Sequence, residues 1–153
     1  MTIDDIVAFV EGLGSVVTQT PREGDGTPEL AWGDVFFYFS PDGTLPTTQP
    51  LATIVTKTYP GEEASRLDRP GAFRLNVAAG RDVFTEYTGY APRELPESVE
   101  PSADDTVIAH PTYGSLGWLA VVNPGENTER DVQRLLRAAW ESARARYGRR
   151  EGL

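Results

Sequence analysis

Apolar residues recur at helical spacing near both ends of the chain. The first stripe comprises Ile3, Ile6, Val7, Val10 and Leu13, and the second comprises Val132, Leu135, Leu136, Ala139, Trp140, Ala143 and Tyr147. Thr2 stands three residues before Asp5, which is the spacing of an acidic capping box. Thr128 and Asp131 repeat that spacing before the second stripe. The pattern therefore predicts an amphipathic helix at the start and a longer one at the end.

Six segments between these helices are rich in β-branched and aromatic residues, as is typical of strands. They are residues 15–20, 29–39, 51–58, 72–77, 106–109 and 116–122. Residues 72–77 alternate between apolar and polar side chains, which predicts a strand whose exposed face carries Arg74 and Asn76. A helical turn within residues 60–71 and a short helix over 81–87 complete the predicted elements.

The order of these elements predicts a single α+β domain over residues 1–150. A mostly antiparallel sheet would pack against the N-terminal helix and the long C-terminal helix. Residues 91–105 contain three prolines and five acidic residues, so we expect a mobile acidic loop there and not a linker between domains. Residues 151–153 are expected to form a short tail.

Cysteine is absent and histidine occurs once, which excludes disulfides, zinc ribbons and cysteine nucleophiles. Neither glycine-rich phosphate motif of nucleotide-binding proteins occurs, and the remaining carboxylates are scattered. Asp25, Asp42 and Glu62 stand in glycine turns, where acidic residues usually serve the turn itself. We therefore expect no metal and no cofactor. The acidic N-terminus and the short apolar runs favour a cytoplasmic protein without a secretory signal or membrane span.

The formal net charge of −9 argues against nucleic acid as a partner, because an acidic surface repels phosphates. Residues 130–150 are an exception, with seven arginines against two acidic residues. A solvated helix face is the simpler interpretation of this segment. Nucleic-acid binding through the arginine-rich helix is the alternative, and it predicts an affinity that falls steeply with salt.

The segment 57–76 concentrates residues that could hold a carboxylate or phosphate. Together with Trp32 and His110, the candidate ligand-binding residues are Lys57, Arg66, Arg69, Arg74 and Asn76. A cluster of ion pairs and hydrogen bonds among Arg66, Asp68 and Arg69 that stabilises the loop is the competing interpretation, and Trp32 would equally suit the core.

His110 is the only histidine and therefore the one side chain whose ordinary pKa suits acid–base catalysis near neutral pH. Asp104 or Asp105 could orient its ring. A loop histidine bonded to the backbone is the structural interpretation of the same residue. The favoured hypothesis is a non-enzymatic module that binds a small anionic ligand or a protein partner. A small hydrolase or isomerase using His110 is the first alternative.

Four segments carry a resemblance to known proteins: AWGDVFFYF, ATIVTK, SRLDRPGAFRLNV and GWLAVVNPG. With the two terminal helices, they resemble a family of small acidic actinobacterial proteins of unknown function over nearly the whole chain. SRLDRPG and NPG are the most specific parts of this resemblance. The element order is also similar to that of MmcQ/YjbR-like proteins, which implies an α+β double-wing fold and a DNA-binding role by analogy. The net charge of −9 argues against that role here.

Overall fold

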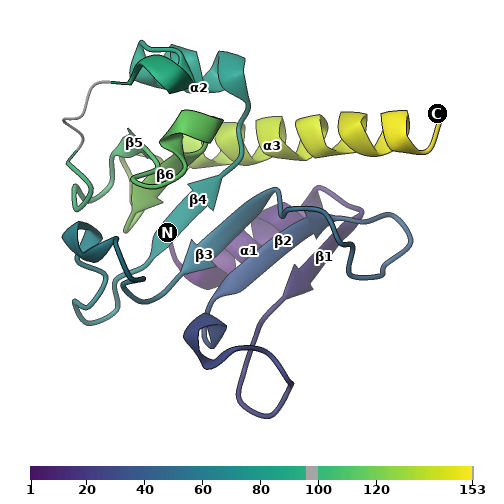
Figure 1. Cartoon of the computed structure of the whole chain (residues 1–153), viewed down its shortest axis with the longest axis horizontal. Coiled ribbons are helices and arrows are strands. Elements are labelled where there is room, and N and C mark those ends of the chain that lie inside the picture. Colours follow the sequence, from purple (N-terminus) through teal and green to yellow (C-terminus); the bar gives the residue numbers. More distant parts are fainter. Residues whose placement is uncertain (96–99, 153) are drawn as a thin grey trace.

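The computed structural model describes residues 1–95 and 100–152, and its strands form one sheet (Figure 1). Within these residues the sheet contains β1 (Val16–Gln19), β2 (Val35–Phe39), β3 (Ala52–Val55), β4 (Arg74–Val77), β5 (Val107–Ala109) and β6 (Leu119–Val122). The strand order is β1-β2-β3-β4-β6-β5, and every neighbouring pair is antiparallel. The helices are α1 (Ile3–Gly12), α2 (Arg81–Thr88) and α3 (Glu129–Arg150). The predicted α+β domain is confirmed.

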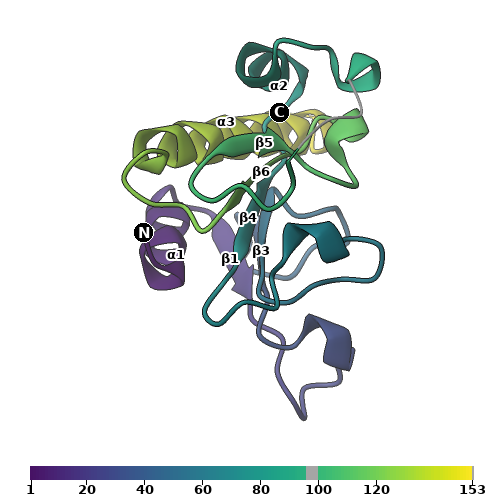
Figure 2. The same ribbon diagram turned by 90° about the vertical axis from the view of Figure 1, so that its left-hand side faces the viewer.

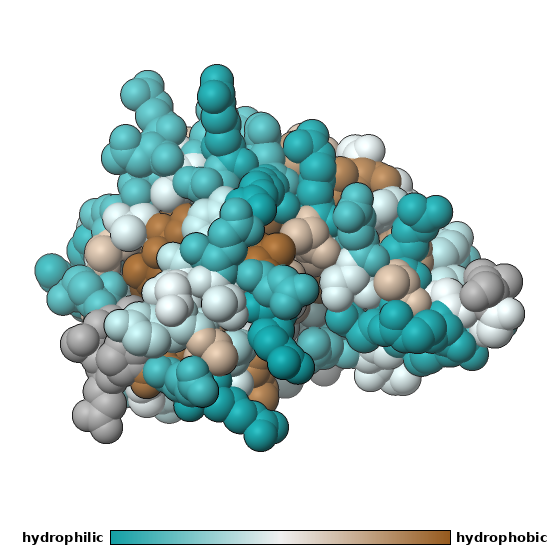
Figure 3. Space-filling model, turned by 90° about the horizontal axis from the view of Figure 1, so that it is seen from above, coloured by the Kyte–Doolittle hydropathy of each residue, from teal (hydrophilic) through white to brown (hydrophobic). Residues whose placement is uncertain are grey.

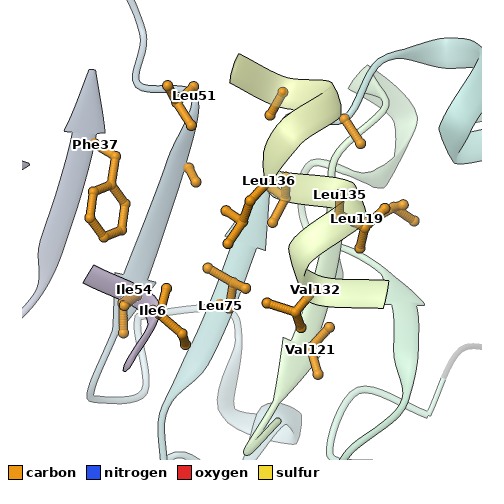
Figure 4. Packing of buried hydrophobic residues seen from close by; sticks show 14 of the residues in the cluster. Ile6, Phe37, Leu51, Ile54, Leu75, Leu119, Val121, Val132, Leu135 and Leu136 are labelled. Atoms are coloured by element: carbon orange, nitrogen blue, oxygen red, sulfur yellow. The ribbon is translucent and has the colours of Figure 1, made fainter. Parts of the chain in front are cut away.

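The hydrophobic core lies between one face of the sheet and the helices α1 and α3. Figure 4 shows Ile6 of α1 beside Ile54 and Leu75 of the sheet, while Leu135 and Leu136 of α3 project toward the same layer. All five side chains are fully buried. Burying side chains of this size contributes about 1.5–3 kcal/mol each, so the two terminal helices are held by this layer.

The start of α1 confirms the predicted capping box. The Thr2 hydroxyl accepts a hydrogen bond from the Asp5 backbone N–H at 3.1 Å, and the Asp5 carboxylate accepts one from the Thr2 N–H at 2.8 Å. This reciprocal pair satisfies two backbone donors that an isolated helix end would leave free.

The capping box predicted for α3 is wrong. The Thr128 hydroxyl makes no cap bond to its own helix; it donates to Asp105 at 2.5 Å. Asp105 also accepts hydrogen bonds from the backbone N–H groups of Gly125, Asn127 and Thr128, at 2.7, 3.0 and 3.1 Å. Asp105, distant in sequence, therefore holds the turn that leads into α3, whereas a capping box would satisfy backbone N–H groups of the helix itself.

Three predicted strands are markedly shorter than the sequence pattern suggested, and residues 51–58 yield only the four residues of β3. Residues 29–39 yield only β2, because Glu29–Ala31 form a 3-10 turn and Gly33 follows with a φ of +89°. Residues 116–122 yield only β6, because Gly114–Leu116 also form a 3-10 turn. The other strands, the turn at Glu63–Ser65 and the short helix α2 lie where they were expected.

The second face of the sheet is covered by loops, and here the sequence prediction needs correction. Arg74 and Asn76 share one face of β4 as predicted, but they are 1% and 3% exposed. In Figure 2 the turn Glu63–Ser65 lies across β3 and β4 from α1, so it covers this second face. Alternation places a polar side chain on a given face; it does not reveal whether a loop returns to bury it.

The acidic segment 91–105 is only partly described, because residues 96–99 lie outside the described residues. Its described parts include a 3-10 turn at Pro92–Glu94 and a β-bridge between Asp104 and Val122. The mobility predicted for this segment stays a prediction. Residue 153 of the predicted tail is also outside the described residues.

The face seen from the side of α2 is mostly hydrophilic, with small hydrophobic areas between charged side chains (Figure 3). None of the helices in the described ranges combines the length and the apolar character needed to cross a membrane.

We predict that Asp105→Ala destabilises the fold by about 2 kcal/mol, because it leaves three backbone N–H groups and a hydroxyl without their acceptor. Asp104→Ala is the matched control, since Asp104 makes an exposed ion pair with Arg69 that is worth less than about 1 kcal/mol. Urea denaturation of both variants measures the difference. Equal losses in the two variants would contradict the role of Asp105.

Candidate functional site

A cavity of about 390 Å³ lies over the second face of the sheet. Residues of β3 and β4, with His110 directly after β5, supply its floor, and Phe36 of β2 and the segments after β3 and β5 supply much of its wall. Its apolar lining comprises Phe36, Pro50, Val55, Tyr113, Leu116 and Trp118. Its polar lining comprises Gln49, Thr53, Tyr59, Glu62, Arg74, Asn76 and His110. The cavity thus combines aromatic walls with a polar floor.

Arg74 is the centre of that floor, and each nitrogen of its guanidinium donates a hydrogen bond. Nε donates to Asn76 Oδ1 at 2.7 Å, and Nη1 donates to Ser65 Oγ at 3.0 Å. Nη2 donates to Glu62 Oε1 at 2.7 Å. Asn76 in turn donates to Thr53 Oγ1 at 2.9 Å. Because a buried guanidinium requires partners for its N–H groups, these contacts fix its orientation.

Glu62 is the carboxylate that balances Arg74. Its side chain is 10% exposed, and its second oxygen accepts a hydrogen bond from the Thr112 hydroxyl. Burial acts to raise the pKa of Glu62, but the bonds from Thr112 and Arg74 outweigh it and hold the pKa below its ordinary value. Glu62 was expected to serve its own glycine turn, and that prediction is wrong. Asp25 and Asp42 do serve their turns, through bonds to Thr27 and Thr44.

His110 lies beside Arg74 with both ring nitrogens facing N–H groups. Nδ1 accepts hydrogen bonds from the backbone N–H groups of Thr112 and Tyr113, at 3.0 and 2.9 Å. Nε2 lies 3.2 Å from Arg74 Nη2. Burial, reinforced by the charge of Arg74 and partly offset by Glu62, lowers the pKa of His110 to about 3. The ring is therefore neutral at physiological pH.

A second buried cluster surrounds Asp34, which is 1% exposed. Asp34 Oδ1 accepts from Lys57 Nζ at 3.0 Å and from the Thr56 backbone N–H at 2.8 Å. Its other oxygen accepts the Tyr59 hydroxyl, and this contact adds to burial in raising the pKa of Tyr59. Tyr59 lines the cavity, so the Asp34 cluster anchors one side of its wall.

Three of the seven predicted ligand-binding residues come together at the cavity, namely Arg74, Asn76 and His110. The other four do not line it. Lys57 is held by Asp34 and by the Trp32 carbonyl, and Trp32 donates from its indole to the Thr27 carbonyl at 3.2 Å.

Arg66 and Arg69 lie on the loop outside the cavity. Arg66 ends the 3-10 turn with a φ of +55°. Arg69 bonds to the Arg66 carbonyl, which fits the loop-stabilising interpretation, but its ion pair is with Asp104 and not with Asp68.

The pairing of His110 with Asp104 or Asp105 is wrong. Asp104 bonds to Arg69 and Asn123, and Asp105 bonds to the loop that leads into α3. The ion pairs among the described residues do not include His110. Without a carboxylate to orient it, and with a depressed pKa, the ring is poorly placed for acid–base work. No group of three or more metal-ligating side chains occurs in the described part of the chain.

Several arginines of α3 pack against the protein's own side chains. Arg134 forms an ion pair with Glu86 at 2.6 Å and lies over the ring of Tyr87. Arg137 lies over Phe9 in the same way. These contacts fit the solvated-face interpretation of the helix, and nucleic-acid binding through it stays a prediction.

The cavity residues outside the predicted ligand-binding set include Glu62 and the aromatic residues Phe36, Tyr113 and Trp118. Phe36 could have been found, because its place in β2 alternates with the core residues Val35 and Phe37. Tyr113 and Trp118 lie in a loop whose path no local pattern reveals.

A family model described as "Family of unknown function (DUF6194)" matches residues 1–152. The chain belongs to this family. The expected membership of a family of unknown function is thereby confirmed, while the actinobacterial source and the MmcQ/YjbR-like resemblance stay predictions. No match to the chain is found among curated proteins or among solved structures. The role of the cavity is therefore inferred from its own residues.

We predict that Glu62→Gln lowers the free energy of unfolding of the natural chain but raises that of an Arg74→Met variant. In the natural chain it weakens a buried ion pair and destabilises the fold. In an Arg74→Met background, which itself costs about 3–5 kcal/mol, it removes an uncompensated buried charge and stabilises the fold. Urea denaturation of the natural chain, the two single variants and the double variant gives the four free energies of this double-mutant cycle. Additive effects of the two substitutions would contradict the buried pair.

We predict that His110 makes the fold acid-sensitive. Because its pKa is about 3 in the folded chain and about 6.5 in the unfolded chain, the unfolded chain gains a proton first as the pH falls. The stability from a neutral ring is complete above pH 6.5 and is lost toward pH 3, by up to about 1.4 kcal/mol per pH unit. His110→Asn should flatten the stability profile between those limits. Parallel profiles for the two proteins would overturn the assignment.

Proposed function

We propose that this protein binds a small organic molecule in the cavity over the second face of its sheet. The observation that carries the proposal is the buried Arg74–His110 pair at the floor of a cavity with aromatic walls. Small-molecule sites typically combine mostly apolar walls with a few polar groups that fix the ligand's orientation. The cavity volume of about 390 Å³ is within the range of such sites.

The composition of the floor supports a binding role over a purely structural one. A buried ion pair stabilises a fold little compared with apolar residues of similar volume, because desolvation offsets the attraction. Here the pair is supported by Ser65, Asn76 and Thr112, which come from three separate segments. Such a network fixes the orientation of the guanidinium but adds little net stability compared with apolar residues. A fixed orientation is what a binding site requires.

The rim of the cavity supports the same role. Leu116 is 74% exposed and Tyr113 is 50% exposed, although both line the cavity. Exposed apolar side chains at the mouth of a cavity would gain buried area when a ligand enters. The rim therefore favours a ligand with an apolar body.

The distribution of charge bears on the anionic ligand that the sequence suggested. Arg74 is paired with Glu62, Lys57 with Asp34, and Arg69 with Asp104. Of these cations only Arg74 lines the cavity, and its charge is balanced there. A ligand without net charge therefore fits the floor better than an anion.

We predict that Leu116→Trp, which places a bulky ring at the mouth, abolishes ligand binding without unfolding the protein. The matched control is Leu45→Trp, an exposed leucine outside the cavity lining. The measurement is a thermal-shift screen of planar aromatic fragments on the natural chain and both variants. A fragment at about five times its Kd adds about 1 kcal/mol, or about 2–4 °C in Tm.

The proposal expects fragments that raise the Tm of the natural chain and of Leu45→Trp but not of Leu116→Trp. It is overturned if no fragment raises the Tm, or if the rise is the same in Leu116→Trp.

A further inference from the structure

The hydrogen bonds around His110 leave its ring proton without an acceptor. A neutral imidazole carries one proton, on either Nδ1 or Nε2. Two backbone N–H groups donate to Nδ1, and an Arg74 N–H group lies 3.2 Å from Nε2. In the described part of the chain the ring has three N–H neighbours and is bonded to no acceptor.

The two backbone N–H groups decide where the proton lies. A proton on Nδ1 would oppose both of them, whereas a proton on Nε2 opposes only the Arg74 group. The ring therefore carries its proton on Nε2. His110 and Arg74 both line the cavity, and their Nε2 and Nη2 atoms then carry two N–H groups side by side, 3.2 Å apart. Both residues are at least nine-tenths buried, so an unsatisfied donor here is costly.

We propose that the ligand places one neutral carbonyl oxygen between His110 Nε2 and Arg74 Nη2. A carbonyl oxygen has two lone pairs and can accept from both donors at once. This inference rests on the proposed function and names the class of ligand: a planar apolar molecule that carries a ketone, amide or similar carbonyl group.

The neighbouring charges select a carbonyl over a carboxylate. Glu62 Oε1 already accepts from the same Arg74 nitrogen at 2.7 Å, and the His110 ring is neutral. A carboxylate at the floor would therefore lie near the Glu62 charge in a buried site, and like charges repel strongly there. A neutral oxygen satisfies both donors without that repulsion.

The walls select the body of the ligand. Tyr113 and Trp118 flank the His110 ring, with centroid distances of 4.9 and 6.5 Å, and Phe36 lines the cavity as well. Aromatic side chains favour flat partners that stack or meet them edge to face. A bicyclic aromatic ring is therefore a suitable probe.

The test uses three probes of matched shape: 2-acetylnaphthalene, 2-naphthoate and 2-isopropenylnaphthalene. They carry a neutral carbonyl, a carboxylate and no oxygen acceptor, respectively. Titration into the protein, followed by the backbone amide NMR signals of Tyr113 and Leu116, gives both the site and the Kd. We expect the ketone to bind about tenfold more tightly than either of the others, because only it satisfies both donors without repulsion.

Two variants of His110 locate the contact. In His110→Asn the side-chain oxygen can still accept from the backbone N–H groups, but the Nε2 donor is gone. We expect its ketone affinity to fall about tenfold, to the level of the alkene probe. In His110→Gln an amide N–H can take the place of Nε2–H, so the preference for the ketone should persist.

The outcomes separate this inference from the proposed function. Tight binding of 2-naphthoate or of the alkene, equal to that of the ketone, overturns the carbonyl inference and leaves small-molecule binding intact. Full ketone affinity in His110→Asn also overturns it. If none of the three probes shifts the Tyr113 and Leu116 signals, the proposed function fails, and this inference fails with it.

Discussion

The ion pair between Arg74 and Glu62 is the contact on which the second face of the sheet depends. Arg74 is the first residue of β4, a strand in the interior of the sheet, where a fully apolar residue would ordinarily pack against the covering loops. Its guanidinium instead ties the turn at Glu63–Ser65 to the sheet, because it bonds both Ser65 and the preceding Glu62. The same group reaches His110 in the loop after β5. The turn at Glu63–Ser65 and the loop after β5, which lie around the cavity, thus both contact one buried charge.

The two faces of the sheet are built on different physical principles. The face toward α1 and α3 is a continuous apolar layer, which tolerates exchange among residues of similar volume. The other face carries only a small apolar cluster, comprising Val55, Leu67, Ala72 and Val122, beside a hydrogen-bonded network in which each member depends on its neighbours. Stability is therefore expected to come mainly from the helix-covered face, while specificity for a ligand comes from the network. Because the main apolar core lies on the other face of the sheet, the site can be polar without destabilising that core.

The fold was largely predictable from the sequence because its signals are local. The apolar stripes of α1 and α3, the Thr2 cap and the alternation in β4 each involve residues a few positions apart. The site was predictable only in part, since its contacts join distant segments. Arg74, Asn76 and His110 were found as unusual residues, but the bonds from Glu62 to Arg74 and from Asp105 to the start of α3 depend on how loops return to the sheet. The local spacing of apolar and polar residues does not predict how a loop folds back onto the sheet.

The measurement that tests this account most directly is the protonation state of the His110 ring. His110 is the only histidine, so ¹⁵N-labelled histidine gives a single pair of ring nitrogen signals. Their chemical shifts distinguish a protonated from an unprotonated nitrogen. We expect a neutral ring at neutral pH, with the proton on Nε2 and an unprotonated Nδ1 that accepts hydrogen bonds from two backbone N–H groups. A charged ring, or a proton on Nδ1, would contradict the arrangement of donors at the cavity floor.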